Sequence, residues 1–95
     1  MSTPTELSDI AGLAAGEYGA KAITGTDAVT PATGYYFAAL HAMAATDVAE
    51  QEDVAGAHNP TLSDITSIPA NSVLYGKWSS ITLTSGQMIG YYKKL

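Results

Sequence analysis

The residues of this chain that could bind a metal are few and widely spaced. His41 and His58 are its two imidazoles, and they lie 17 residues apart, outside any helical or His-Glu-x-x-His spacing. A metal site built on them would need a carboxylate from Asp47 or Asp53. Surface or interface positions are the commoner setting for such histidines. We therefore expect no metal site at this pair.

Three carboxylates in one short segment are the other candidate for cation binding. Glu50, Glu52 and Asp53 supply the oxygen ligands that calcium prefers. The segment lacks the Asp-x-Asp-x-Asp-Gly run of an EF-hand loop, so a solvated acidic face is the interpretation that we adopt. We predict no cofactor.

Covalent catalysis has no recognisable motif in this chain. Cysteine is absent, and no serine lies in a Gly-x-Ser-x-Gly sequence. Gly12, Gly16, Gly19 and Gly25 match neither the dinucleotide-binding fingerprint nor the P-loop. We expect a protein that is not an enzyme.

Aromatic side chains are the group with the clearest binding potential, because tyrosine and tryptophan bury a large ring while keeping a polar tip satisfied. The adjacent pairs Tyr35-Tyr36 and Tyr91-Tyr92 must point to opposite faces if they lie on strands, so one ring of each pair faces away from the core. Contact with another subunit is favoured; simple exposure and carbohydrate binding are the alternatives. The candidate interface residues are Tyr35, Phe37, Tyr75, Trp78, Tyr91 and Tyr92.

Short β-strands are expected to position these rings. In residues 78–84, Ile81 and Leu83 fall on one face while the intervening polar residues fall on the other, as a half-buried strand requires. Residues 84–87 can close a hairpin, with Gly86 supplying a positive φ, so that Ile89 and Tyr91 would pack beside Ile81 and Leu83.

Residues 35–52 are ambiguous, because their alanines favour helix while their aromatic and β-branched residues favour strands. We predict two strands joined by a turn at residues 44–47. Residues 53–64 are predicted to form a loop, and Gly76-Lys77 to interrupt the strand signal. Further short strands are expected at residues 21–26, 65–68, 72–75 and 87–92.

These elements predict an all-β protein: a small antiparallel sandwich or barrel, jelly-roll-like, with an extended N-terminal arm. Ninety-five residues allow one core. Residues 1–20 are polar or glycine-interrupted, and we assign them to an arm that orders on a neighbouring subunit, with terminal disorder as the alternative. Residues 21–95 form the single β-rich domain.

The supply of bulky apolar residues is thin for a solitary fold. Hydrophobic residues make up 46% of the chain, but 16 of them are alanine. Domains below about 100 residues often rely on disulfides, metals or oligomerisation. Because cysteine is absent, we expect a homo-oligomer, with a trimer favoured.

Charge and hydropathy argue against two further classes of partner. Four lysines and no arginine against nine acids give a net charge of −5, which repels phosphate backbones, so we expect no nucleic-acid binding. The longest apolar run, residues 35–45, is interrupted by His41 and is about half of a membrane span. We expect no membrane insertion and, from residues 1–10, no secretory signal.

The last third of the chain combines an Ile-Pro-Ala turn at residues 68–70, a Tyr-Gly pair at residues 75–76 and an Ile-Thr-Leu-x-Ser-Gly segment at residues 81–86. With this pattern, the last 60 or so residues resemble small virion structural proteins of tailed bacteriophages. Residues 35–40, Tyr-Tyr-Phe-Ala-Ala-Leu, look like the strand that often precedes this pattern. Residues 1–30 carry none of it.

The resemblance implies a capsid decoration or cement subunit. Such a subunit would self-associate, contact the major capsid protein or other virion proteins, and lie on the outer surface of the head. The alternative within the same family is a tail spike, fibre or neck module that contributes to receptor or glycan binding.

Overall fold

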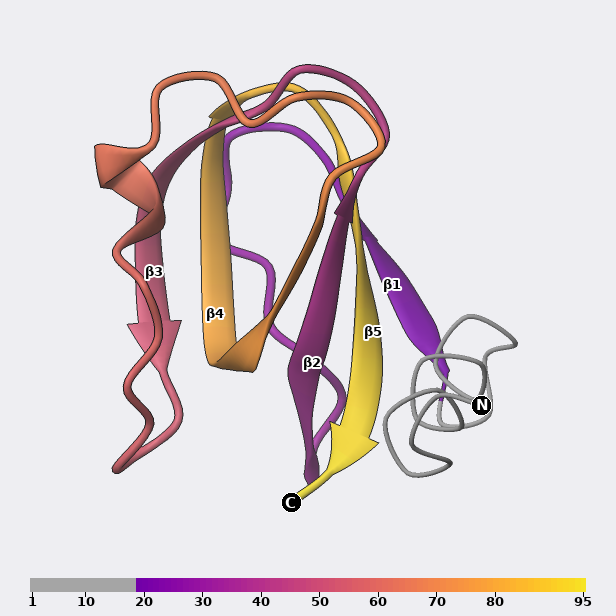
Figure 1. Cartoon of the computed structure of the whole chain (residues 1–95). Helices are drawn as coiled ribbons and strands as arrows, with labels where there is room; N and C mark the ends of the chain where they lie inside the picture. The colour runs from indigo at the N-terminus through magenta and orange to yellow at the C-terminus, as the bar shows by residue number, and fades with distance from the viewer. Residues whose placement is uncertain (1–18) are drawn as a thin grey trace, which may run out of the picture.

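The computed structural model describes residues 19–95, which form five β-strands and one short 3-10 helix (Figure 1). The all-β prediction is confirmed. The predicted arm lies almost wholly outside the described residues, except that strand β1 begins at Ala20, one residue before the predicted boundary. The elements are β1 (Ala20–Ile23), β2 (Tyr35–Ala42), β3 (Asp47–Asp53), η1 (Leu62–Asp64), β4 (Val73–Ser85) and β5 (Met88–Lys94).

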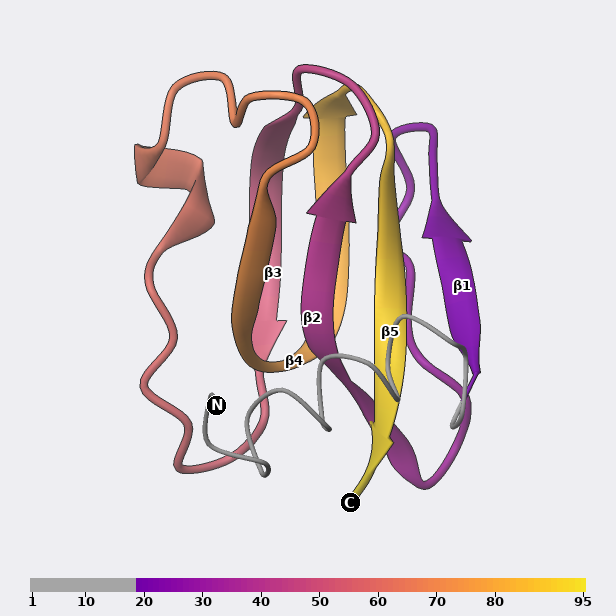
Figure 2. The ribbon, with the colours of Figure 1, turned by 45° about the vertical axis from the view of Figure 1, so that its right-hand side comes forward.

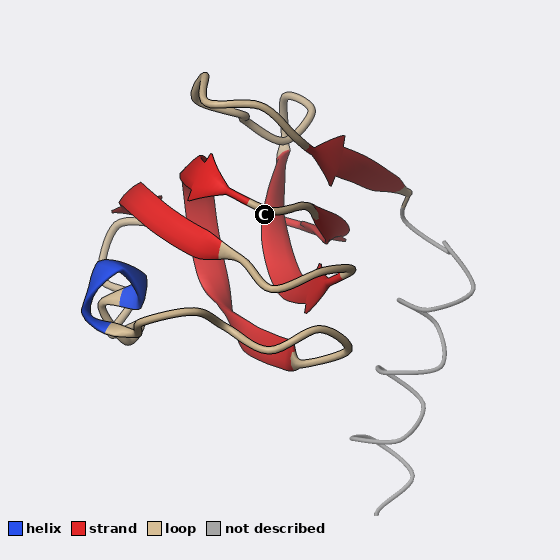
Figure 3. Cartoon of the chain, turned by 90° about the horizontal axis from the view of Figure 1, so that it is seen from above, coloured by secondary structure: helices blue, strands red, loops and turns tan. Residues whose placement is uncertain are grey.

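The five strands form one antiparallel sheet in the order β1-β5-β2-β4-β3, and this sheet folds over into two layers. Strand β4 connects the two layers. It runs beside β2, turns back and returns beside β3 (Figures 1 and 2). The first layer holds β1, β5, β2 and the first half of β4, and the second holds β3 and the second half of β4. Seen from above, the strands surround a central space (Figure 3).

The hydrophobic core fills the space between the two layers, and every strand contributes to it. Ile81 and Leu83 point inward, as their alternation predicted. Leu62 of η1 and Ile68 of the following loop are also fully buried. The core residues are Ile23, Phe37, Leu40, Ala42, Val48, Leu62, Ile68, Trp78, Ile81, Leu83 and Met88.

Strand β4 changes partner at Trp78, which is aligned with Phe37 of β2 on one side and with Asp53 of β3 on the other. We call residues 76–78 the β4 corner. At Gly76, an added Cβ would lie 2.8 and 2.9 Å from two carbons of the Trp78 ring. The corner therefore needs a residue without a side chain where the indole lies against the backbone.

Asn59 fastens the corner from outside the sheet. Its amide oxygen accepts from the N–H of Lys77 (2.9 Å), and its amide nitrogen donates to the carbonyl oxygen of Lys77 (2.7 Å). The backbone N–H of Val54 donates to the same carbonyl (2.9 Å). Asn59 thus supplies Lys77 with the pair of hydrogen bonds that a neighbouring strand would otherwise give.

The second polar anchor is Thr46, between β2 and β3. Its hydroxyl donates to the carbonyl oxygen of Ala44 (2.7 Å) and accepts from the N–H of Gln87 (3.2 Å). Its backbone exchanges two hydrogen bonds with Ile68 (2.9 and 2.7 Å). Gly86 adopts φ +92°, as predicted, and an added Cβ there would collide with Thr46. Thr46 therefore joins two turns and a loop at one end of the sheet.

The predicted hairpin at residues 84–87 is wrong, because β4 and β5 are not neighbours in the sheet. Strand β5 pairs with β1 and β2, and β2 lies between β4 and β5. Ile89 and Tyr91 accordingly lie beside His41 and Ala39 of β2, away from Ile81 and Leu83. A tight turn determines only where the chain reverses direction. Which strands become neighbours depends on how side chains pack in the core, and here β2 lies between β4 and β5.

Two other local predictions need correction, and one is confirmed. Residues 65–68 make no strand, only the bridge between Ile68 and Thr46. The strands predicted at residues 72–75 and 78–84 are one bent strand, Val73–Ser85, which Gly76-Lys77 does not interrupt. Residues 35–52 form two strands, as predicted over the helical alternative, although β4 lies between them. The alanines of β2 are mostly buried against neighbouring strands, and this packing outweighs their helix propensity.

We predict that Gly76→Ala destabilises the fold by about 1–3 kcal/mol, because the added methyl group overlaps the Trp78 ring and the Asn59 amide oxygen. Urea unfolding followed by tryptophan fluorescence measures the loss. Ser85→Thr is the control, since it adds one methyl group to the same strand at an exposed position. Equal losses in the two variants would contradict a special requirement at the corner.

Candidate functional site

The six predicted interface residues divide between the two faces of the first layer. Phe37 and Trp78 are fully buried in the core, away from the surface of the chain. Tyr92 packs on Phe37 with ring centres 5.8 Å apart, and Tyr35 stacks on Tyr92 at 5.7 Å. Tyr35 and Tyr92 therefore extend the core toward the end of the sheet and are only partly exposed.

Tyr75 and Tyr91 lie on the opposite, outward face. Both are aligned with Ala39 of β2, one from each side. Tyr36 is on this face as well, in a small cluster with Ala38, Ala39 and Tyr91. Each adjacent tyrosine pair thus sends one ring to each face, as the sequence predicted.

These residues belong to a continuous surface, which we call the aromatic sheet face. Cross-strand neighbours share a face of a sheet, so the registers define its rows. One row holds Ala22, Ile89, His41 and Val73, and the next holds Ala20, Tyr91, Ala39 and Tyr75. The third row is Lys93, Tyr36 and Lys77.

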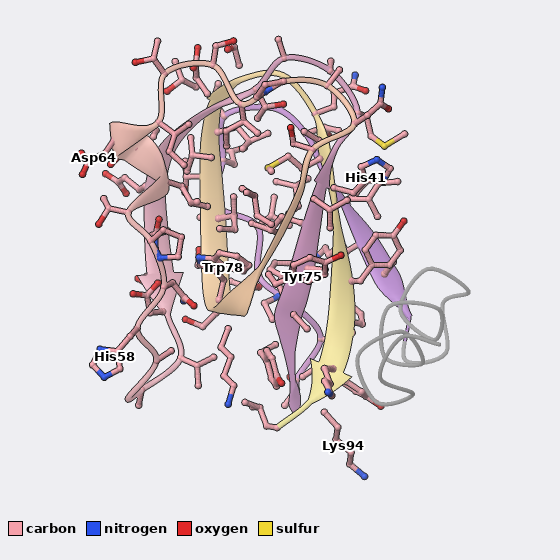
Figure 4. The ribbon with its side chains drawn as sticks, viewed as in Figure 1. His41, His58, Asp64, Tyr75, Trp78 and Lys94 are labelled. Carbon is pink, nitrogen blue, oxygen red and sulfur yellow. The ribbon has the colours of Figure 1, made fainter. Side chains whose placement is uncertain are left out.

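The β4 edge of the aromatic sheet face is open to solvent. Tyr75 is 53% exposed and Val73 41% exposed, two of the most exposed large apolar side chains among residues 19–95. The middle of the face is covered, because Ala39, between Tyr75 and Tyr91, is buried in a small cluster with Tyr36. Figure 4 shows Tyr75 and His41 on the side of β2 and β5. Such a contiguous apolar patch is typical of a binding surface.

Lysines border this face at one end. The Lys77 ammonium lies 5.9 Å from the centre of the Tyr36 ring, within range of a cation–π interaction. Lys93 is aligned with the same tyrosine from β5. No Asp or Glu stands in the three rows of the face as the described strands form it. The face therefore presents aromatic rings with a positive border.

Most acidic residues of the described chain gather on the other layer. Glu50, Glu52 and Asp53 follow one another on β3, and Asp47 begins that strand. Asp53 accepts from the amide nitrogens of Asn59 (2.9 Å) and Gln51 (2.8 Å), and these two bonds lower its pKa, against a small opposing effect of burial. Asp53, one of the three carboxylates considered as calcium ligands, thus helps to hold the loop of Asn59 at the β4 corner.

The histidine pair does not come together. His41 lies on β2 and His58 in the loop after β3, on different sides of the molecule (Figure 4). Within residues 19–95, no three His, Asp or Glu side chains are grouped to hold a metal ion.

In comparisons with known proteins, no family model, curated protein or solved structure matches the chain. Among the described residues, no helix has the length and apolar character needed to cross a membrane.

Sequence reasoning missed several residues that the fold makes important. Val73, Ile89 and Tyr36 were not among the interface candidates, although the first two alternate with inward residues along their strands. Asn59 and Thr46 carried no sequence signal beyond turn propensity, because their partners are distant in the chain. Their roles arise only from tertiary contacts.

The lowered pKa of Asp53 predicts an acid-dependent part of the stability. The hydrogen bonds from Asn59 and Gln51 stabilise the charged carboxylate in the folded chain more than water does in the unfolded chain. This contribution to the free energy of unfolding is present at neutral pH and is lost as the pH falls below about 4. We expect Asp53→Asn to be less stable than the parent protein at pH 7 and closer to it at pH 3. Urea unfolding at both pH values measures this difference.

Asp27→Asn, which removes an exposed loop carboxylate, is the matched control. If Asp53→Asn and Asp27→Asn showed the same difference from the parent at both pH values, the carboxylate of Asp53 would have no special role at the corner.

Proposed function

We propose that this chain is a structural subunit of a protein assembly and that it associates with other protein copies through the aromatic sheet face. The observation that carries the proposal is the row of Tyr91, Ala39 and Tyr75, which spans three strands with a half-exposed tyrosine at its edge. Apolar area removed from water contributes about 25 cal/mol per Å², so covering this face would stabilise an assembly.

The assembly that we propose is the head of a tailed bacteriophage, with this chain as a decoration or cement subunit on its outer surface. The resemblance of residues 35–40 and 65–91 to small virion proteins supports this reading. The net negative charge also suits a position away from the packaged genome. Contacts repeated with sister subunits, trimeric by preference, and with the major capsid protein would reinforce the shell by avidity.

A glycan-binding module of a tail spike or fibre is the second candidate, because one observation favours it. The Tyr75 ring is exposed at the edge of a sheet face that also carries Tyr91, and exposed aromatic rings are suited to stack on sugars. Glycan-array binding that disappears in a folded Tyr75→Ala variant would favour this function over the first.

We predict that Tyr75→Lys lowers self-association at least about tenfold, because it replaces the most exposed aromatic ring of the face with a charge. Size-exclusion chromatography with light scattering, over a concentration series, measures the effect. Thr26→Lys adds the same charge at an exposed position in the loop between β1 and β2 and should associate like the parent protein.

A parent protein that stays monomeric at high concentration and does not bind purified heads lacking it would overturn the proposed function. Unfolding curves of both variants serve to exclude loss of the fold as the cause of weaker association.

A further inference from the structure

We infer that the occupant of the aromatic sheet face is the acidic β3 side of a second copy of this chain, so that subunits join head to tail. This inference rests on the proposed function and specifies its partner surface. A head-to-tail contact uses two different surfaces of each subunit and closes into a ring when the rotation between copies allows it. It is therefore compatible with the trimer expected from the sequence.

The first support is the separation of charge in the described chain. Its four lysines lie on β1, on β5 and at the β4 corner: Lys21, Lys77, Lys93 and Lys94. Five of the six acids of residues 19–95 lie on β3 or η1, namely Asp47, Glu50, Glu52, Asp53 and Asp64. Figure 4 shows Asp64 beside β3 and Lys94 at the far end of β5. One subunit thus carries both halves of a complementary pair.

The second support is the state of the individual carboxylates. Asp47 accepts from the backbone N–H of Ser67 (2.6 Å), and Asp53 accepts from Asn59 and Gln51, so both are used inside the chain. Glu50 and Glu52 are exposed on β3, aligned with Thr82 and Ser80 of β4. These two glutamates are the acids that this strand presents to a partner.

The third support is the poor charge balance of the symmetrical alternative. If two aromatic sheet faces met each other, Lys77 would enter an interface whose three rows contain no acid. Burying a charge without a counter-charge is costly. A head-to-tail contact instead brings Glu50 and Glu52 of one copy toward the Lys77 border of the next, and complementary charges favour that register.

Charge reversal in the full-length chain tests the inference. We expect Glu50→Lys/Glu52→Lys to weaken self-association about tenfold or more, because two attractive contacts become repulsive. Adding Lys77→Glu to the same chain should restore at least part of the association, since the signs are then exchanged on both surfaces. Sedimentation equilibrium at low salt measures all three proteins, and the differences should shrink in about 1 M salt, where the screening length is about 3 Å.

Thr26→Lys/Asp27→Lys/Thr33→Lys is the matched control: it changes the net charge by the same amount, at exposed positions in the loop between β1 and β2 that lie outside the proposed contact. It should associate like the parent protein. Equal weakening in this control would attribute the effect to net charge and overturn the inference.

The outcomes separate the inference from the function on which it rests. An oligomer that is sensitive to Tyr75→Lys but unchanged by Glu50→Lys/Glu52→Lys would overturn the head-to-tail contact and leave self-association through the face intact. A parent chain that is monomeric throughout but binds purified heads lacking it would overturn the inference alone, and one that is monomeric and does not bind those heads would overturn both.

Discussion

The fold depends on the bend in β4, because this one strand belongs to both layers. Trp78 fills the inside of the bend, Gly76 makes room for its ring, and Asn59 supplies hydrogen bonds to Lys77 from the outside. A sheet of five strands that stayed flat would leave one side of Phe37 and Leu40 in water. The bend folds the sheet over these residues and lets a chain with few bulky apolar residues enclose a core.

The same bend separates the two surfaces that could bind partners. It turns β3, with its glutamates, onto the opposite layer from the aromatic sheet face. Polar contacts at the bend use Asp53 and Gln51, so those β3 side chains act within the fold, whereas Glu50 and Glu52 stay exposed. An internal requirement of folding thereby produces a subunit with an apolar, positively bordered face and an acidic one.

The role in assembly that we propose rests on surfaces. The aromatic sheet face offers several rings and an exposed apolar edge at Val73 and Tyr75, which suit contact with a protein surface better than with a small molecule in a cavity. The link to phage heads comes from the sequence pattern of residues 35–40 and 65–91. The surface chemistry supports association in general, and the sequence pattern supports that particular assembly.

The sequence by itself determined the strand content, because alternation in residues 78–84, turn residues and aromatic spacing are local signals. It also determined that the paired tyrosines face opposite ways. Only the tertiary structure decided which strands are neighbours: the turn at Gly86 looks like a hairpin, yet β2 pairs between β4 and β5. It likewise decided that Trp78 and Phe37 are core while Tyr75 and Tyr91 are surface. The physical reason is that burial depends on which layer covers a side chain, and that layer is built by residues distant in the chain.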